Sequence, residues 1–107
     1  MRDKPASTTA GISSPTQPLW AAPLYHHFLW GRLDQDHLLM NPLSGKTHLL
    51  NELAAEILTE LGRGPATVKG LIERLDLAEE EVEAWPQFLR VLDELDRFGL
   101  VTPMDPL

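Results

Sequence analysis

The sequence contains no cysteine among its 107 residues. This absence excludes a disulfide scaffold, a zinc site with cysteine ligands and a catalytic thiol. It fits the reducing cytosol, so we expect a cytoplasmic protein. No apolar run approaches the roughly 18 residues that span a membrane, and the N-terminal residues lack the apolar segment of a secretory signal. The length corresponds to one small domain.

Positive charge is also scarce, because nine Lys and Arg residues face 16 Asp and Glu residues and leave a net charge of −7. Lys and Arg supply most of the non-specific affinity for nucleic acid, so we expect no nucleic-acid partner. The acidity is concentrated in residues 51–107, where five basic residues face 13 acidic ones. A winged-helix DNA-binding regulator stays open as an alternative, although it needs a basic recognition helix.

Side chains suited to catalysis or metal binding are few and scattered. None of the four histidines lies at the i, i+3 or i+4 spacing of helical metal ligands; they are His26, His27, His37 and His48. Ser44-Gly45-Lys46 lacks the upstream glycine of a phosphate-binding loop. The acidic run at 79–83 is typical of a helix N-terminus. We therefore expect no enzyme, catalytic residue, metal or cofactor.

Residues 1–18 are rich in Ser, Thr, Pro and Ala, and Ile12 is their only large aliphatic residue after Met1. Such a segment buries too little apolar surface to offset its ordering entropy. We predict a disordered N-terminal tail over residues 1–18 and a folded domain over residues 19–107.

Three short strands are predicted at the start of this domain, over residues 26–33, 37–41 and 46–50. Pro42 fixes φ early in the connection between the last two, and Gly45 can adopt a positive φ near its end. This combination is typical of a hairpin with a longer loop.

From residue 51 onward the apolar period changes from two to 3.6, which predicts three helices. Asn51 and Thr67 can cap the first two, and Gly62 and Gly64 are expected to stop the first. Gly70 is expected to serve a close helix contact. The third helix is predicted over residues 78–98, where Pro86 should kink or split it. The fold class is therefore α+β and winged helix-turn-helix-like, with a three-stranded antiparallel sheet followed by three helices.

The third helix is apolar over two neighbouring stripes that together cover about 200°, against about 100° for a typical surface helix. The stripes are Val82, Trp85, Leu89 and Leu92, and Phe88, Val91, Leu95 and Phe98. Either this helix is central and touches both sheet and helices, or part of it lines a groove beside a sheet edge, where a peptide can add a strand. We place the core at Leu53, Ile57, Leu58, Leu61, Leu71, Ile72, Leu75, Leu89 and Leu92.

The segment NPLSGKTHLLNELAAEIL at residues 41–58, with GPAT at 64–67 and FGLVTP at 98–103, resembles the PqqD family. It is most similar to the branch called HPr-rel-A system PqqD-type peptide chaperones. The resemblance covers roughly residues 24–103 and rests on the order and spacing of short apolar motifs. Pro86 and the long N-terminal segment depart from the family pattern.

This resemblance implies a peptide-binding module that recognises the leader of a ribosomally synthesised precursor peptide and presents it to a modifying enzyme. That enzyme would be of the radical SAM class or an HPr-kinase-like neighbour. The leader would add a strand beside the third helix. The implied peptide-binding residues are Lys46, Thr47, His48, Leu49, Leu50, Phe88, Val91, Leu92, Leu95 and Phe98. A structural subunit or homodimer that uses the same surface is the other alternative.

Overall fold

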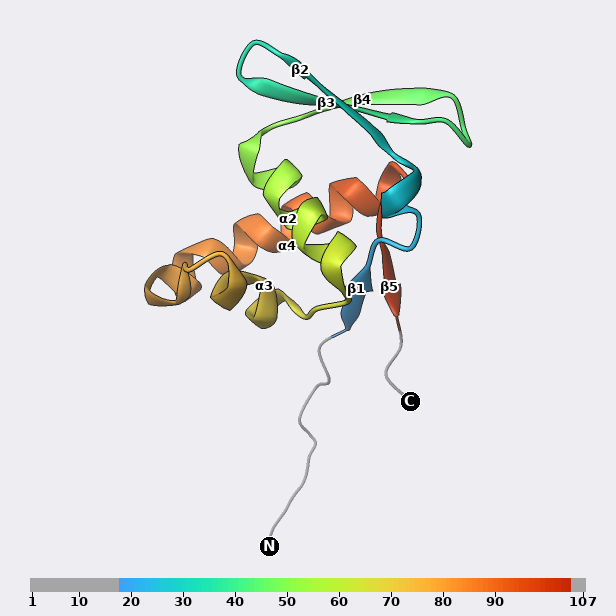
Figure 1. The fold of residues 1–107 in the computed structure, drawn as a ribbon. Coiled ribbons are helices and arrows are strands. Elements are labelled where there is room, and N and C mark those ends of the chain that lie inside the picture. Colours follow the sequence, from blue (N-terminus) through green and yellow to red (C-terminus); the bar gives the residue numbers. More distant parts are fainter. Residues whose placement is uncertain (1–17, 105–107) are drawn as a thin grey trace, which may run out of the picture.

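The computed structural model describes residues 18–104, so the expectation for the tail falls, apart from Pro18, outside the described residues. Three α-helices and a three-stranded sheet make up most of this part, with a two-stranded sheet beside them (Figure 1). The elements in chain order are β1 (Leu19–Ala21), the 3-10 helix η1 (Tyr25–His27), β2 (Leu29–Leu33), β3 (Asp36–Asn41), β4 (Lys46–Leu50), α2 (Glu52–Arg63), α3 (Val68–Arg74), the 3-10 helix η2 (Ala78–Glu80), α4 (Glu81–Arg97) and β5 (Thr102–Met104).

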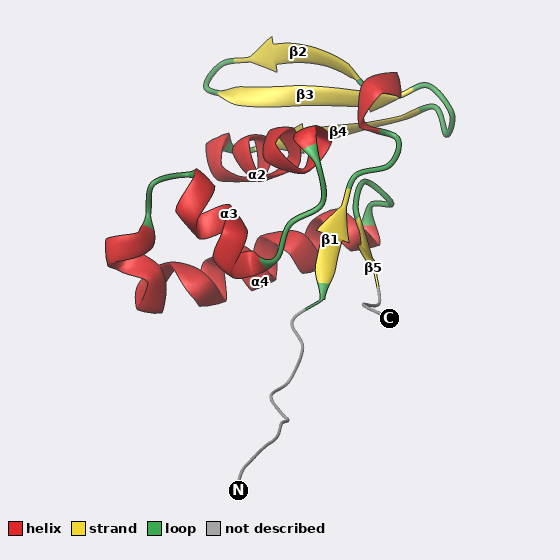
Figure 2. Ribbon diagram, turned by 60° about the horizontal axis from the view of Figure 1, so that its bottom comes forward, coloured by secondary structure: helices red, strands yellow, loops and turns green. Residues whose placement is uncertain are grey.

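The larger sheet is antiparallel with strand order β2-β3-β4, which confirms the predicted α+β class and the three-stranded sheet. Strand β4 has the predicted bounds, whereas β2 begins at Leu29 because η1 occupies the preceding residues. The β3–β4 loop closes as expected: Gly45 adopts a φ of 76°, and its N–H donates to the Asn41 carbonyl at 2.8 Å. The helices cover one face of this sheet and leave the other bare (Figure 2).

A second sheet joins the two ends of the described chain, and sequence reasoning did not predict it. Strand β1 pairs antiparallel with β5, with Leu19 opposite Met104. On its other side, the Trp20 N–H donates to the Ala66 carbonyl at 2.8 Å, and the Ala66 N–H donates back to the Trp20 carbonyl at 3.0 Å. Strand β1 therefore ties β5 to the loop between α2 and α3.

Both predicted helix caps are confirmed. The Asn51 side chain accepts a hydrogen bond from the Ala54 N–H at 2.9 Å, and Thr67 Oγ1 accepts one from the Gly70 N–H at 3.1 Å. Helix α2 ends at Arg63 with Gly64 as its C-cap, as expected, whereas the expectation for Gly62 is wrong, because this residue lies within the helix. A Cβ at Gly62 would overlap the Tyr25 ring, so this glycine permits the close packing of η1 on α2.

Helix α4 runs without a break through Pro86, so of the two predicted alternatives, a kink or a split, the split is wrong. The change of helix type occurs earlier, between η2 and α4. Pro86 removes a hydrogen bond to the carbonyl of Val82. Val82 is 89% exposed, so water can satisfy this carbonyl.

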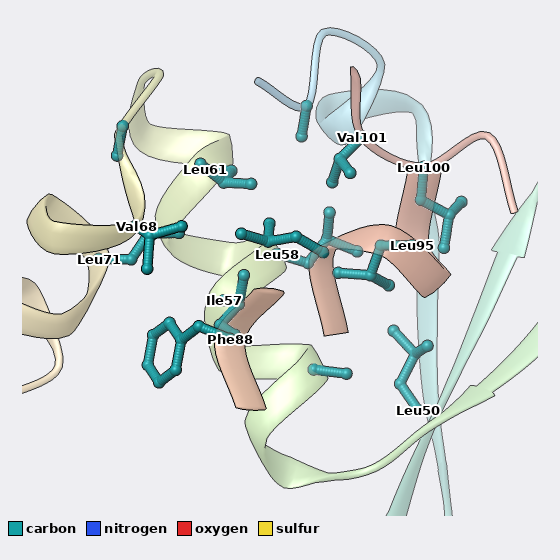
Figure 3. Packing of buried hydrophobic residues seen from close by; sticks show 14 of the residues in the cluster. Leu50, Ile57, Leu58, Leu61, Val68, Leu71, Phe88, Leu95, Leu100 and Val101 are labelled. Carbon is teal, nitrogen blue, oxygen red and sulfur yellow. The ribbon is translucent and has the colours of Figure 1, made fainter. Parts of the chain in front are cut away.

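The core lies between α2, α3 and α4 and extends to the inner face of the sheet (Figure 3). Leu39 and Leu50 contribute from the sheet, and α4 contributes Ala84, Phe88, Leu92 and Leu95. Six of the predicted core residues are buried; they are Ile57, Leu58, Leu61, Leu71, Ile72 and Leu92. Leu53 and Leu75 are partly buried and pack against the cluster.

The assignment of Leu89 to the core is wrong, because this side chain is 44% exposed. Phe88 and Leu95 take its place and are almost completely buried. Successive residues of a helix point in directions about 100° apart, so the two apolar stripes of α4 lie on different sides of the helix. Periodicity alone does not select between them. The buried face takes Leu92 from the first stripe and Phe88 and Leu95 from the second, and contacts with α2 and α3 select it.

Candidate functional site

Strand β4 forms one edge of the three-stranded sheet, and within residues 18–104 it pairs with β3 alone. An edge strand presents backbone N–H and C=O groups that can accept a further strand. The strand named by the sequence analysis therefore has the position that strand addition requires.

The inner face of β4 rests on the C-terminal part of α4. The His48 and Phe98 rings stack with centroids 4.6 Å apart and an interplanar angle of 21°, and the buried Leu50 joins the same core cluster as Leu95 (Figure 3). Burial, with a smaller contribution from the positive charge of Lys46, lowers the pKa of His48 below its usual 6.5. His48 therefore favours the neutral form in the folded chain.

A groove runs along α4 next to the point where β4 leads into α2. Its first part has a volume of about 500 Å³ and is lined by Asn51, Leu53, Gln87, Arg90, Val91, Glu94 and Arg97. An adjacent cavity of about 340 Å³ shares Leu53 and Gln87 with it and extends toward η2. We call these two cavities the α4 groove.

The ten predicted site residues separate into two groups. The five residues of β4 lie on the edge strand as expected. Of the residues in and after α4, Val91 is half-buried and lines the α4 groove. Phe98 is 38% exposed and stacks on His48. Phe88, Leu92 and Leu95 are buried in the core, and of these three Phe88 also lines the second cavity of the groove.

Sequence reasoning missed most of the groove wall because it searched for apolar side chains. Gln87, Arg90, Glu94 and Arg97 lie on one face of α4 together with Val91. Their spacing of three or four residues was visible in the sequence. It indicated a shared face, but not that this face borders a cavity.

No group of three or more metal-ligating side chains occurs within residues 18–104. In the same range, no helix combines the length and hydropathy needed to cross a membrane. His26 and His27 lie in η1, while His37 and His48 lie on neighbouring strands.

Comparisons with protein-family models, curated protein sequences and solved structures found no match to this chain.

Proposed function

We propose that this chain is a non-catalytic peptide-binding protein that pairs an extended peptide with the open edge of β4. The observation that carries the proposal is the position of the α4 groove at the end of this edge strand, where Asn51 joins β4 to α2. Strand addition combines main-chain hydrogen bonds at an edge with pockets for side chains. The edge and the groove supply these two requirements.

The resemblance to the PqqD family supplies the finer proposal. The peptide would be the leader of a ribosomally synthesised precursor, and the chain would act as a cytoplasmic chaperone that presents it to a modifying enzyme of the radical SAM class or to an HPr-kinase-like partner. The order of a three-stranded sheet followed by three helices supports this assignment at the level of fold class.

Near Arg90 and Arg97 the charges of the α4 groove favour an acidic peptide side chain, whereas Glu80 and Glu83 line the adjacent cavity. Arg90 and Arg97 line the groove with Glu94 between them, and Arg97 is only loosely paired with Asp93 at 4.0 Å. The acidic balance of residues 51–107 would by itself favour a basic peptide. Screening limits the reach of distant exposed charges to about a Debye length. The charges in the groove therefore determine which peptide charge is preferred there.

The proposal is tested by selecting binders from a display library of random 12-residue peptides and mapping amide exchange with the enriched peptide. Protection of the β4 amides together with chemical-shift changes at Val91 and Arg90 is expected. Protection confined to β2, or to residues 1–18, would overturn the proposed site.

The outer face of the sheet favours a homodimer as a second candidate, through a different surface from the one that the sequence predicted for it. Four apolar side chains on this face are exposed by between 37% and 55%; they are Leu29, Leu33, Met40 and Leu49. The register places them on the same face as Leu38 and Gly31. The acidic helices lie behind the opposite, inner face of the sheet (Figure 2). Two copies can therefore pack their outer faces together with little charge repulsion.

The patch spans only three short strands, whereas a stable interface buries roughly 800 Å² on each partner. A weak dimer is therefore expected. Sedimentation over a wide concentration range tests it: Met40→Lys should abolish any self-association, whereas a purely monomeric wild type would exclude this candidate.

A further inference from the structure

The opposite edge of the sheet has a pocket of different chemistry. It has a volume of about 470 Å³ and lies between the inner face of the sheet, η1 and α2. Its lining is Tyr25, Trp30, His37, Glu52, Ala55, Glu56, Thr59, Glu60 and Leu75. We call it the β2 pocket.

One side of the β2 pocket is aromatic. The Tyr25 and Trp30 rings have centroids 6.1 Å apart, and Trp30 meets His37 edge-on at 6.3 Å. Tyr25 is fixed in this place by its packing on Gly62. Aromatic faces attract organic cations through their quadrupole, most strongly for Trp.

The other side carries three carboxylates at consecutive i, i+4 positions of α2, namely Glu52, Glu56 and Glu60. Glu52 lies 3.5 Å from His37 Nε2, and Glu60 lies 3.9 Å from Arg63 at the rim. Among residues 18–104, Glu56 at the centre has no basic partner within ion-pair distance. A positive group between Trp30 and Glu56 would meet an aromatic face and a carboxylate together.

Backbone geometry provides a route into this pocket. Strand β2 is the second edge of the sheet, and all five of its residues are exposed. Trp30 pairs with Leu39, which is completely buried, so Trp30 lies on the inner face. Because side chains alternate between faces along a strand, a strand added to β2 would direct every second side chain toward the pocket.

We propose that the β2 edge and the β2 pocket form a second peptide site, which takes an extended segment with an inward Arg or Lys side chain. The cation lies between Trp30 and Glu56, and the backbone pairs with β2. This site does not depend on peptide binding at β4, since it uses the other edge of the sheet.

The probe is the peptide Ac-Thr-Val-Arg-Val-Thr-amide, whose β-branched residues favour an extended chain. The matched probe has citrulline in place of Arg and is a neutral isostere. Titration is followed by the NMR signals of the Trp30 indole, the Glu56 amide and the β2 amides. The Arg peptide is expected to shift all three, and citrulline to weaken binding by about tenfold.

Glu56→Gln is expected to reduce the preference for Arg over citrulline, and added salt to do the same in the wild type. The matched control is Glu73→Gln on the exposed side of α3, which should leave the preference unchanged. Trp30→Val keeps a strand-forming residue and should weaken the Arg peptide.

Equal binding of the citrulline peptide, or an unchanged preference in Glu56→Gln, would overturn the cation pocket. Binding of free arginine amide as tight as that of the peptide would overturn strand addition at β2. Shifts confined to β4 and α4 would also overturn this site while supporting the proposed function.

Discussion

The imidazole of His48 stacks on the ring of Phe98, and this contact joins the edge strand β4 to the end of α4. Immediately beyond Phe98, Gly99 adopts a φ of 78°, and the Leu100 N–H donates to the Leu95 carbonyl at 2.9 Å. This is the pattern of a glycine-terminated helix. The end of α4 is thus held from both sides, by its own cap and by β4.

The lowered pKa of His48 predicts a specific dependence of stability on pH. The unfolded chain titrates near 6.5, above the folded state, so it binds more protons between the two pKa values. This contribution to stability is complete above about pH 6.5 and is lost as the pH falls through the folded-state pKa. His48→Gln should therefore show a smaller loss of Tm than the wild type between pH 7.5 and pH 5.

His27→Gln in the exposed η1 segment is the control and should follow the wild type. NMR titration of the His48 ring measures its pKa directly. Since Lys46 contributes to the lowering, Lys46→Gln should move this pKa back toward 6.5. A His48 pKa at or above 6.5 in the wild type would contradict the prediction.

Two glycines in helices predict opposite effects of the same substitution. Gly62→Ala places a methyl group into the Tyr25 ring, and overpacking costs typically about 1–3 kcal/mol. In Gly70→Ala the added Cβ would lie 3.4 Å from Thr67 Oγ1, an ordinary contact distance. This substitution should therefore stabilise the chain by up to about 1 kcal/mol through helix propensity. Urea unfolding of both variants checks the pair. Stabilisation by Gly62→Ala would mean that Tyr25 does not pack as described.

The expectation that Gly70 serves a close helix contact is not supported, since no other helix lies within 4 Å of the position of its Cβ. Gly62 has the close contact instead. A lone helical glycine in a sequence signals a packing or functional reason, but its partner lies far away in the chain. The Tyr25–Gly62 contact joins residues 37 positions apart, which local patterns do not identify.

Local sequence signals predicted the helices and the larger sheet well. The β1–β5 pairing, the buried face of α4 and the groove wall depend on contacts between residues far apart in the chain. Asn51 and Thr67 act on amides three residues away, so their caps were predictable. The β1–β5 pairing joins Leu19 to Met104, and no turn between them marks it. In α4 the choice between Leu89 and Phe88 depended on which helices lie beside it. The edge position of β4 followed from its hairpin, whereas the polar groove wall did not.

The corrected face of α4 predicts a contrast between two leucines. Leu95→Ala removes a side chain that is 1% exposed, and such truncations cost about 2–5 kcal/mol. Leu89→Ala removes one that is 44% exposed, and should cost less than about 1 kcal/mol. Chemical denaturation of both variants measures the difference. Equal losses would show that α4 is rotated relative to the arrangement described here.

The last prediction concerns peptide binding at β4. Arg90→Glu reverses a charge in the wall of the α4 groove. It should weaken a peptide selected by the wild-type chain at least fivefold if the peptide carries an acidic residue there, because repulsion replaces attraction as the groove closes. Arg90 is exposed, so the Tm should change little. Leu89→Glu, which adds a carboxylate outside the groove on the adjacent residue, is the matched control and should bind normally.

Val91→Thr tests the apolar part of the same groove without changing its volume. Val91 is half-buried, and the added hydroxyl would lose water when a peptide side chain covers it. Severalfold weaker binding measured by calorimetry is expected.

Thr47→Pro and His48→Pro complete the test, because successive N–H groups of an edge strand point alternately to its partner and to the open side. One of the two should weaken binding with little effect on the sheet, and the other should disrupt the β3–β4 pairing. If both proline variants and Arg90→Glu bind the peptide like the wild type, the peptide does not bind along β4.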